Sequence, residues 1–207
     1  MGKIAAEERL REILSKYVPE SALEYASSLV IDYKPLLKIT RSRSSKLGDY
    51  RSPHLGKPHQ ITINHDLNPF SFLITFVHEF AHMETWMAYK NKVAPHGPQW
   101  KLAFKKLMEP LMNSNVFPED VLIELSRYMN NPAASSCADV SLLKVLRLYD
   151  TKESGPTIDA LPEGAFFRLR NGMVMQKGIK LRKRFRCIEV NTKRMYLVSP
   201  VAEVEAV

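Results

Sequence analysis

The sequence predicts an α+β fold, with a small antiparallel sheet packed on helices and a separate β-rich region after it. Three observations predict this arrangement. The segment 69–91 repeats Phe and Met at three- and four-residue spacings, as a buried helix does. Short runs before this segment alternate apolar and polar residues, which is typical of strands. From residue 164 the chain changes to short alternating runs that are joined by turn residues.

The N-terminal third should contain two amphipathic helices and three strands. Apolar residues recur on one face over 3–17 and again over 20–30, which predicts the helices. Strands are expected at 36–40, around Gly48 and at 59–64, where β-branched and apolar residues alternate between Ser, Gly and Pro. We expect these strands to pair as the antiparallel sheet.

A central helix should follow. Asn68 can cap it, Pro69 suits its first position, and it should end near Asn91. Further helices are expected from Pro98 and Pro118. The central helix carries an apolar stripe that should enter the core, made of Phe72, Phe76, Phe80, Met83 and Met87.

We predict three parts in the chain. Residues 1–130 form the main domain, and 131–163 form a linker with a candidate helix at 138–149. Residues 164–207 form a basic β-hairpin region. The pair Asn171-Gly172 in this region is a strong signal for a hairpin turn.

Composition limits the cellular location and the kinds of partner that we expect for the protein. The longest apolar run, Phe70–Val77, is far shorter than the roughly 20 residues that cross a bilayer, so no membrane partner is expected. Only Cys137 and Cys187 are present, which provides neither a disulfide framework nor a four-cysteine zinc module. We therefore expect a cytoplasmic protein, nucleoid-associated if the source is prokaryotic, and a monomer. The net charge of +8 favours an acidic partner, most simply nucleic acid.

The segment HEFAH predicts a metal site. His78 and His82 are four residues apart, so on a helix both imidazoles project from one face and can bind one ion. Glu79 lies beside that face, where a general base can take a proton from water that a Zn²⁺ ion activates. The plain alternative is that these histidines are partly exposed polar positions on a core helix.

A catalytic zinc needs a third protein ligand and one open position. The spacing HExxHxxGxxH is absent, because Thr85 occupies the glycine position and Ala88 the last histidine position. Glu109 is one alternative ligand. Glu84 is another, although its position two residues after His82 turns it away from the ligand face.

His96 is the favoured third ligand. In a continuous helix it would lie about 21 Å beyond His82, too far to share a metal ion. If the helix ends near Lys90, the extended residues that follow can reach back, and the segment APHGPQW has the Pro and Gly residues of a turn. The alternative is an exposed loop histidine.

The other histidines and two aromatic residues have weaker signals. His54, His59 and His65 lack ligand spacing, and we expect surface or loop positions for them. Trp86 and Tyr89 follow His82 at helical spacing and could line a cleft, but core packing is the favoured interpretation.

With HEFAH followed by HGPQW, the sequence resembles the SprT-like family, which includes the Spartan proteases of DNA–protein crosslink repair. The resemblance covers roughly 5–130, and SSKLGDYR and ITINHDL look like the family's strands before the zinc helix. It implies a zincin-like metalloprotease domain, one zinc ion held by three histidines, Glu79 as catalytic base, and proteolysis gated by nucleic acid in the Spartan branch. The matching residues are His78, Glu79, His82, His96, Gly97 and Trp100.

The chain departs from this family after the protease domain. Many relatives carry a four-cysteine zinc ribbon there, whereas this chain has only Cys187 in its β-rich region. We therefore expect 164–207 to be a degenerate, ribbon-like region without a second metal ion.

Cations are concentrated in two parts of the chain, and we predict that both bind DNA, single-stranded or at a junction. The alternative is a solvated basic surface without a partner. The candidate residues are Arg41, Arg43, Lys46 and Arg51 in the first part, and Lys180, Arg182, Lys183, Arg184 and Arg186 in the second.

These observations lead to one hypothesis and two alternatives. The hypothesis is a zinc-dependent endopeptidase that acts on DNA-associated or DNA-crosslinked proteins. The first alternative is a non-catalytic nucleic-acid-binding protein with a structural or vestigial zinc site. The second is a zincin that cleaves free peptides and has no role on DNA.

Overall fold

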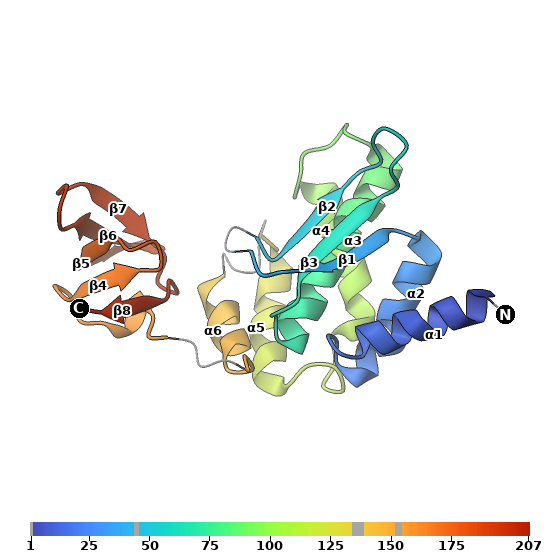
Figure 1. Cartoon of the computed structure of the whole chain (residues 1–207), viewed down its shortest axis with the longest axis horizontal. Helices are drawn as coiled ribbons and strands as arrows, with labels where there is room; N and C mark the ends of the chain where they lie inside the picture. The colour runs from blue at the N-terminus through green and yellow to red at the C-terminus, as the bar shows by residue number, and fades with distance from the viewer. Residues whose placement is uncertain (1, 44–45, 134–138, 152–154) are drawn as a thin grey trace. The chain divides into compact units, whose positions relative to one another are not determined.

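The chain divides into two units, Met1–Tyr149 and Asp150–Val207, and each has a hydrophobic core of its own. They are seen in a computed structural model of the whole chain (Figure 1). The structure describes residues 2–43, 46–133, 139–151 and 155–207.

Both units contain the element types that the sequence predicts. In the first unit they are α1 (Gly2–Leu14), η1 (Glu20–Ala22), α2 (Leu23–Tyr33), β1 (Leu36–Thr40), β2 (Gly48–Arg51), β3 (Gln60–Asn64), α3 (Pro69–Tyr89), α4 (Pro98–Met108), η2 (Glu109–Leu111), α5 (Glu119–Asn130) and α6 (Val140–Arg147). In the second they are η4 (Ile158–Ala160), β4 (Phe166–Leu169), β5 (Val174–Leu181), β6 (Arg184–Glu189), β7 (Met195–Val198) and β8 (Val204–Ala206). The α+β class is confirmed.

The sheet of the first unit is mixed, so the expectation of an antiparallel sheet is wrong. Its order is β1-β3-β2, with β3 parallel to β1 and antiparallel to β2. The chain reverses twice between β1 and β3, which makes these two strands parallel. Four consecutive residues of β3, Ile61 to Asn64, are buried, so this strand takes the central position and leaves β2 at an edge.

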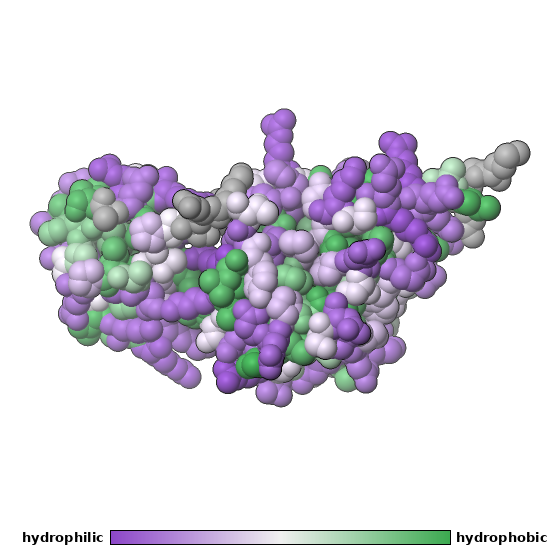
Figure 2. Space-filling model, turned by 90° about the horizontal axis from the view of Figure 1, so that it is seen from below, coloured by the Kyte–Doolittle hydropathy of each residue, from purple (hydrophilic) through white to green (hydrophobic). Residues whose placement is uncertain are grey.

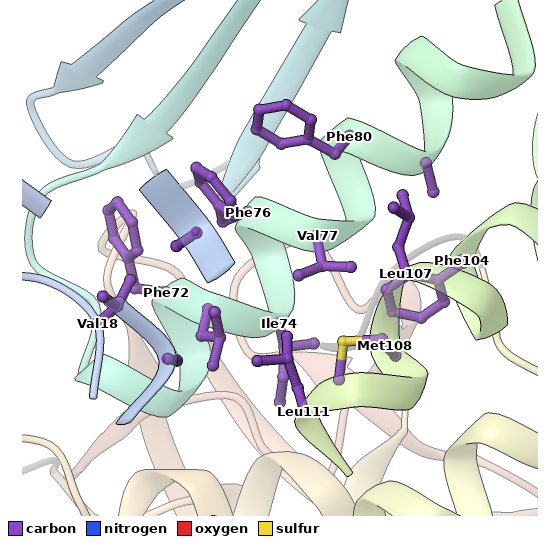
Figure 3. Close-up of a cluster of buried hydrophobic side chains, with 14 of the residues drawn as sticks. Val18, Phe72, Ile74, Phe76, Val77, Phe80, Phe104, Leu107, Met108 and Leu111 are labelled. Carbon is purple, nitrogen blue, oxygen red and sulfur yellow. The ribbon is translucent and has the colours of Figure 1, made fainter. Parts of the chain in front are cut away.

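Helix α3 forms the middle of the first core. The Asn68 side chain accepts a hydrogen bond from the Ser71 amide, as expected of the cap, and Pro69 is the first residue. Figure 3 shows Phe72, Phe76 and Phe80 on one side of α3, and Val77 facing α4 from the other side. Because α3 is packed on both sides, it is held rigidly, as a helix that carries a site must be.

The apolar stripe of α3 stops before its predicted end. Phe72, Phe76, Phe80 and Met83 are fully buried, as predicted, but Met87 is 48% exposed. The last turn of α3 continues past the packed layer, so the expectation that Met87 enters the core is wrong.

The predicted linker over 131–163 is wrong in its extent. Helix α6 lies inside those limits, yet Leu142 and Leu146 are buried in the first core. The Asn68 side chain also donates to the Leu146 carbonyl at 2.8 Å, which ties α6 to the start of α3. The burial of its apolar residues therefore assigns this helix to the first unit. The boundary between the units in the sequence lies between residues 149 and 150.

The second unit is more than a hairpin. Its five strands form a sheet in the order β7-β6-β5-β4-β8, in which every neighbouring pair is antiparallel. The predicted turn at Asn171-Gly172 does join β4 to β5, with Gly172 at φ +85°. Ile158, upstream of the predicted boundary at 164, is buried in the core of this sheet. The unit therefore begins earlier than the sequence suggested.

No helix in the described parts of the chain combines the length and the apolar character that crossing a bilayer requires.

Candidate metal centre

Two histidines of the site come from α3. His78 and His82 lie one turn apart on this helix, and their Nε2 atoms are 3.2 Å from each other. His78 is 8% exposed, because β-strands and α4 cover this part of α3. Helical periodicity alone therefore places two ring nitrogens at one point.

The third histidine returns on the loop after α3. Helix α3 ends at Tyr89, and the φ of +54° at the next residue, Lys90, turns the chain away from the helix axis. His96 also has a positive φ, +57°, an uncommon conformation for a non-glycine residue. The Gly97 amide then donates to the Ala94 carbonyl at 3.0 Å and α4 begins at Pro98. This turn brings His96 Nε2 to 3.3 Å from His78 Nε2.

The three histidines have the spacing of a metal-ligand set. Their candidate ligand atoms all lie within 4.8 Å of one another. Two nitrogens bound tetrahedrally to one ion at 2.0–2.1 Å would be about 3.3 Å apart, which agrees with the two Nε2 distances. Imidazole ligands suit Zn²⁺ and several other transition metals. The triad is thus positioned to hold a metal ion and leaves further coordination positions open.

Trp100 forms the floor of the triad. Its side chain is fully buried, and its ring centroid lies 4.6 Å from that of His78, 5.3 Å from His82 and 4.7 Å from His96. Trp100 also stacks on Phe104 in the core, at 5.1 Å. Because Trp100 is packed in the core and contacts all three histidines, it restricts the movement of their rings.

The surroundings keep the histidines neutral. Burial, followed by the proximity of the other two histidines, lowers the pKa of His78 to about 3. Burial and His96 lower the pKa of His82 to about 4, and burial lowers the pKa of His96. A neutral imidazole has a free lone pair, which is the form that binds a metal ion.

Glu79 is buried beside the triad, under strand β2. It is 6% exposed, and burial, with a smaller contribution from Asp49, raises the pKa of its carboxyl to about 8. The Tyr50 amide donates a hydrogen bond to it and lowers the pKa in part. A Cβ atom on Gly48 would lie 2.5 Å from Glu79 Oε1 and 2.7 Å from Thr75 Cγ2. Only glycine at position 48 lets the strand pass so close to the carboxylate.

Two further side chains of the site were not predicted from the sequence. The Tyr50 ring is parallel to that of His82, at a centroid distance of 6.3 Å, and the Tyr50 hydroxyl is hydrogen-bonded to His59 Nδ1 at 2.8 Å. His59 in turn meets the edge of Trp86 at 5.0 Å. His59 lies in the loop before β3, as expected, but it is half-buried and contacts two side chains next to His82. No sequence signal exists for this contact, because it depends on how β2, β3 and α3 pack.

Trp86 and Tyr89 do not enter the core. Trp86 is half-buried and lines a pocket next to His82, and Tyr89 is 44% exposed. The favoured interpretation of core packing is wrong for both. The last turn of α3 extends beyond the packed layer, so these rings lie outside it.

The other candidate ligands lie elsewhere. Within the described residues, the triad is the one group of three or more His, Cys, Asp or Glu side chains with ligand spacing. Glu84 Oε1 instead lies 3.6 Å from Lys106 Nζ, and Glu109 is exposed in η2. His54 and His65 are exposed, as expected.

The predicted DNA-binding cations of the first unit differ in their surroundings. Arg43 donates to Asn64 Oδ1 at 2.8 Å and to Thr62 Oγ1 at 3.0 Å, so it fastens the chain to β3. Lys46 and Arg51 both form ion pairs with Asp49, at 2.7 and 2.9 Å. Arg41 is exposed.

The predicted cations of the second unit lie around the β5–β6 hairpin. Strand β6 alternates as predicted, because Arg184 and Arg186 are exposed while Phe185 and Cys187 are buried. Arg182 and Lys183 lie in the exposed turn, and Lys180 lies 3.4 Å from Asp159. Leu181 does not pack inward. It pairs with Arg184 and is 40% exposed.

Comparison with known protein families identifies a match that covers this site. Residues 21–121 match the model of the SprT-like family. This segment belongs to the SprT-like family. Searches of curated proteins and of solved structures each return no significant match.

The SprT-like segment contains the whole candidate metal centre. It includes the three-stranded sheet, α3, the returning loop and α4, and it ends before most of α5. Membership is consistent with a hydrolase of the metallopeptidase type. The second unit lies outside the matched segment, so its function must be argued from its own surface.

Proposed function

We propose that the protein is a zinc-dependent metalloendopeptidase, in which His78, His82 and His96 hold the ion and Glu79 is the catalytic base. The observation that carries the proposal is the joint placement of three neutral histidines with converging Nε2 atoms and a buried carboxyl on the next residue of the same helix. The family of residues 21–121 supports the same reaction class.

The ligand set suits a catalytic ion better than a structural one. Structural zinc sites in proteins are closed by four protein ligands, whereas catalytic sites keep a position open. A bound Zn²⁺ ion would supply Lewis acidity and would lower the pKa of water from about 15.7 to about 7. The three histidines would hold the ion, and Trp100 packs against all three of their rings.

Glu79 is suited to move the proton. Its carboxylate accepts a proton from the attacking water and returns it to the nitrogen of the leaving amine. A carboxyl with a pKa near neutrality can do both, and a neighbouring dication would lower its pKa below the value of about 8 that burial produces. The Tyr50 amide and Gly48 hold this carboxylate in one position.

A non-catalytic zinc site, the alternative, explains Glu79 poorly. Burying a carboxyl costs free energy unless a charge or hydrogen bonds compensate for it. A structural site gains nothing from such a group next to its ligands, whereas a hydrolase needs it. The buried position of Glu79 therefore favours catalysis.

We further propose that the substrates are proteins on DNA, single-stranded or at a junction. The support is the surface of the second unit. Residues 180–186 carry five cations and no acidic residue, and Arg184 and Arg186 project from the face of β6 opposite to its buried residues. Figure 2 shows hydrophobic residues among hydrophilic ones on this unit, and cations mixed with apolar groups suit both phosphates and bases.

The decisive experiment compares wild type with Glu79→Gln, both loaded with zinc, on an unfolded protein substrate. We expect Glu79→Gln to bind zinc as wild type does and to lose cleavage by about 10²- to 10⁴-fold, because the base is absent. Equal cleavage by the two proteins would contradict the catalytic proposal.

The same assay with and without single-stranded DNA tests the substrate. A substrate that itself binds DNA should be cleaved faster when DNA is present, whereas a short peptide without DNA affinity should not. Cleavage that ignores DNA in both cases would leave the peptidase and remove the DNA proposal.

A further inference from the structure

A pocket of about 330 Å³ adjoins the metal centre on the His82 side. It is lined from three directions, by the end of β2, by the last turns of α3 and by the loop that carries the chain back to His96. Its volume lies within the range of ligand pockets in proteins, which begins at about 300 Å³. Since His82 and Trp100 belong to both the pocket and the candidate metal centre, a chain bound at the metal would lie next to it.

Six of the eleven residues that line the pocket are apolar or aromatic. Tyr50 and Trp86 provide two ring surfaces, and Val93, Ala94 and Pro95 provide the loop side. Such a wall gains free energy by covering another apolar surface.

The two aromatic side chains are held in place. His59 is hydrogen-bonded to the Tyr50 hydroxyl at 2.8 Å and meets Trp86 edge-on at 5.0 Å, so it connects the two rings. Lys90 Nζ lies 4.0 Å from the centre of the Trp86 ring. A wall that is already ordered loses little side-chain entropy when a ligand binds.

The charge of the wall is positive. Lys90 lines the pocket, and among the described residues that line it none is acidic. A lysine or arginine side chain entering the pocket would meet a like charge and leave its own solvation behind. An apolar side chain meets neither cost.

We propose that this pocket is a specificity subsite, which accepts a large apolar side chain, aromatic in particular, from a substrate residue close to the scissile bond and rejects Lys and Arg. The inference rests on the proposed peptidase function and adds the substrate class. In a basic, DNA-bound protein, cleavage then occurs beside exposed apolar residues and not at the cationic residues that contact DNA.

The first test maps cleavage sites. The zinc-loaded full chain is incubated with a peptide library derived from a proteome, and the new termini are sequenced. We expect Phe, Tyr, Leu and Met to be enriched at one position within two residues of the cut, and Lys and Arg to be depleted there. No enrichment at any such position, or enrichment of Lys or Arg, would overturn the inference.

The second test reverses the charge of the pocket wall. Two peptides that differ only by Phe or Arg at the mapped position are compared through kcat/KM. Wild type should prefer Phe by at least about tenfold, and Lys90→Glu should shrink this ratio by about tenfold, because it replaces a repulsive charge with an attractive one. The matched control is Lys92→Glu, an exposed position in the same loop that does not line the pocket.

The two proposals fail in different ways. If wild type cleaves no peptide faster than Glu79→Gln, the peptidase function is wrong. If wild type cleaves peptides through Glu79 and the Phe-to-Arg ratio stays the same in Lys90→Glu, the peptidase stands and the subsite is wrong.

Discussion

The candidate metal centre of the first unit and the basic hairpin of the second differ in how their side chains are placed. At the candidate metal centre the side chains are buried or half-buried, neutral and held by several neighbours, and two Nε2 distances of 3.2 and 3.3 Å determine what they can bind. On the hairpin, Arg182, Lys183 and Arg186 are long, charged and exposed. Binding at the first region would depend on the exact positions of a few atoms, whereas binding at the second would depend on the number of charges.

This difference is visible in the backbone as well. His96 has a positive φ, and Gly48 allows β2 to pass within contact of Glu79. A positive φ at a non-glycine residue costs free energy, and it persists at His96 because the surrounding structure enforces it. A surface that binds phosphates by charge needs no such precision, because electrostatic attraction acts over about 10 Å in salt solution.

The largest expected effect is the loss of a ligand. His96→Ala should weaken zinc binding by at least about 100-fold, since even partners one step removed from a metal ion are worth 10- to 100-fold in affinity. Competition with a chromophoric zinc chelator measures this directly. The control His54→Ala removes an exposed histidine and should bind zinc as wild type does. Unchanged zinc affinity in His96→Ala would remove His96 from the site.

A smaller but more diagnostic effect is expected at Gly48. The Cβ of Gly48→Ala would collide with Glu79 and Thr75, so cleavage should fall by about 100-fold while zinc affinity stays within a few-fold of wild type. The free energy of unfolding should fall by about 1–3 kcal/mol, as for other overpacked positions.

Gly155→Ala is the matched control for this variant, because the nearest atom to its added Cβ would be 3.8 Å away. It should leave cleavage unchanged. Full activity in Gly48→Ala would mean that the position of Glu79 is less constrained than the contact distances indicate.

The smallest effect is expected on the hairpin, where charges act as a group. The double variant Arg184→Gln/Arg186→Gln should reduce the slope of log affinity against log salt by about 1.4 for single-stranded DNA, or about 0.7 for each lost contact. Fluorescence anisotropy over a salt series measures the slope. Zinc affinity and cleavage of a short peptide without DNA should not change.

The control for the hairpin removes the same charge from the N-terminal segment, with Arg9→Gln in α1 and Lys16→Gln just after it, both at exposed positions. This variant should keep the wild-type slope. An equal decrease in both variants would show that net charge, and not the hairpin, governs DNA binding.

Much of the local structure could be predicted from the sequence. The cap at Asn68, the helix start at Pro98 and the turn at Asn171-Gly172 all follow from preferences of single residues or pairs, and all three are present. Contacts between distant segments could not be predicted in the same way. The parallel pairing of β1 with β3 and the packing of α6 on the first core depend on how segments far apart in the chain cover each other's apolar surface.

The sequence by itself determined the spacing of His78 and His82 with Glu79 between them, because a helix of 3.6 residues per turn leaves one geometry for that pattern. It also indicated that the chain could turn back to His96. Only the tertiary structure decided that β2 passes over Glu79 at Gly48, and that Tyr50 and Trp86, connected by His59, form an ordered wall beside His82. These features arise from contacts between elements, and side-chain packing across such contacts has no periodicity in the sequence.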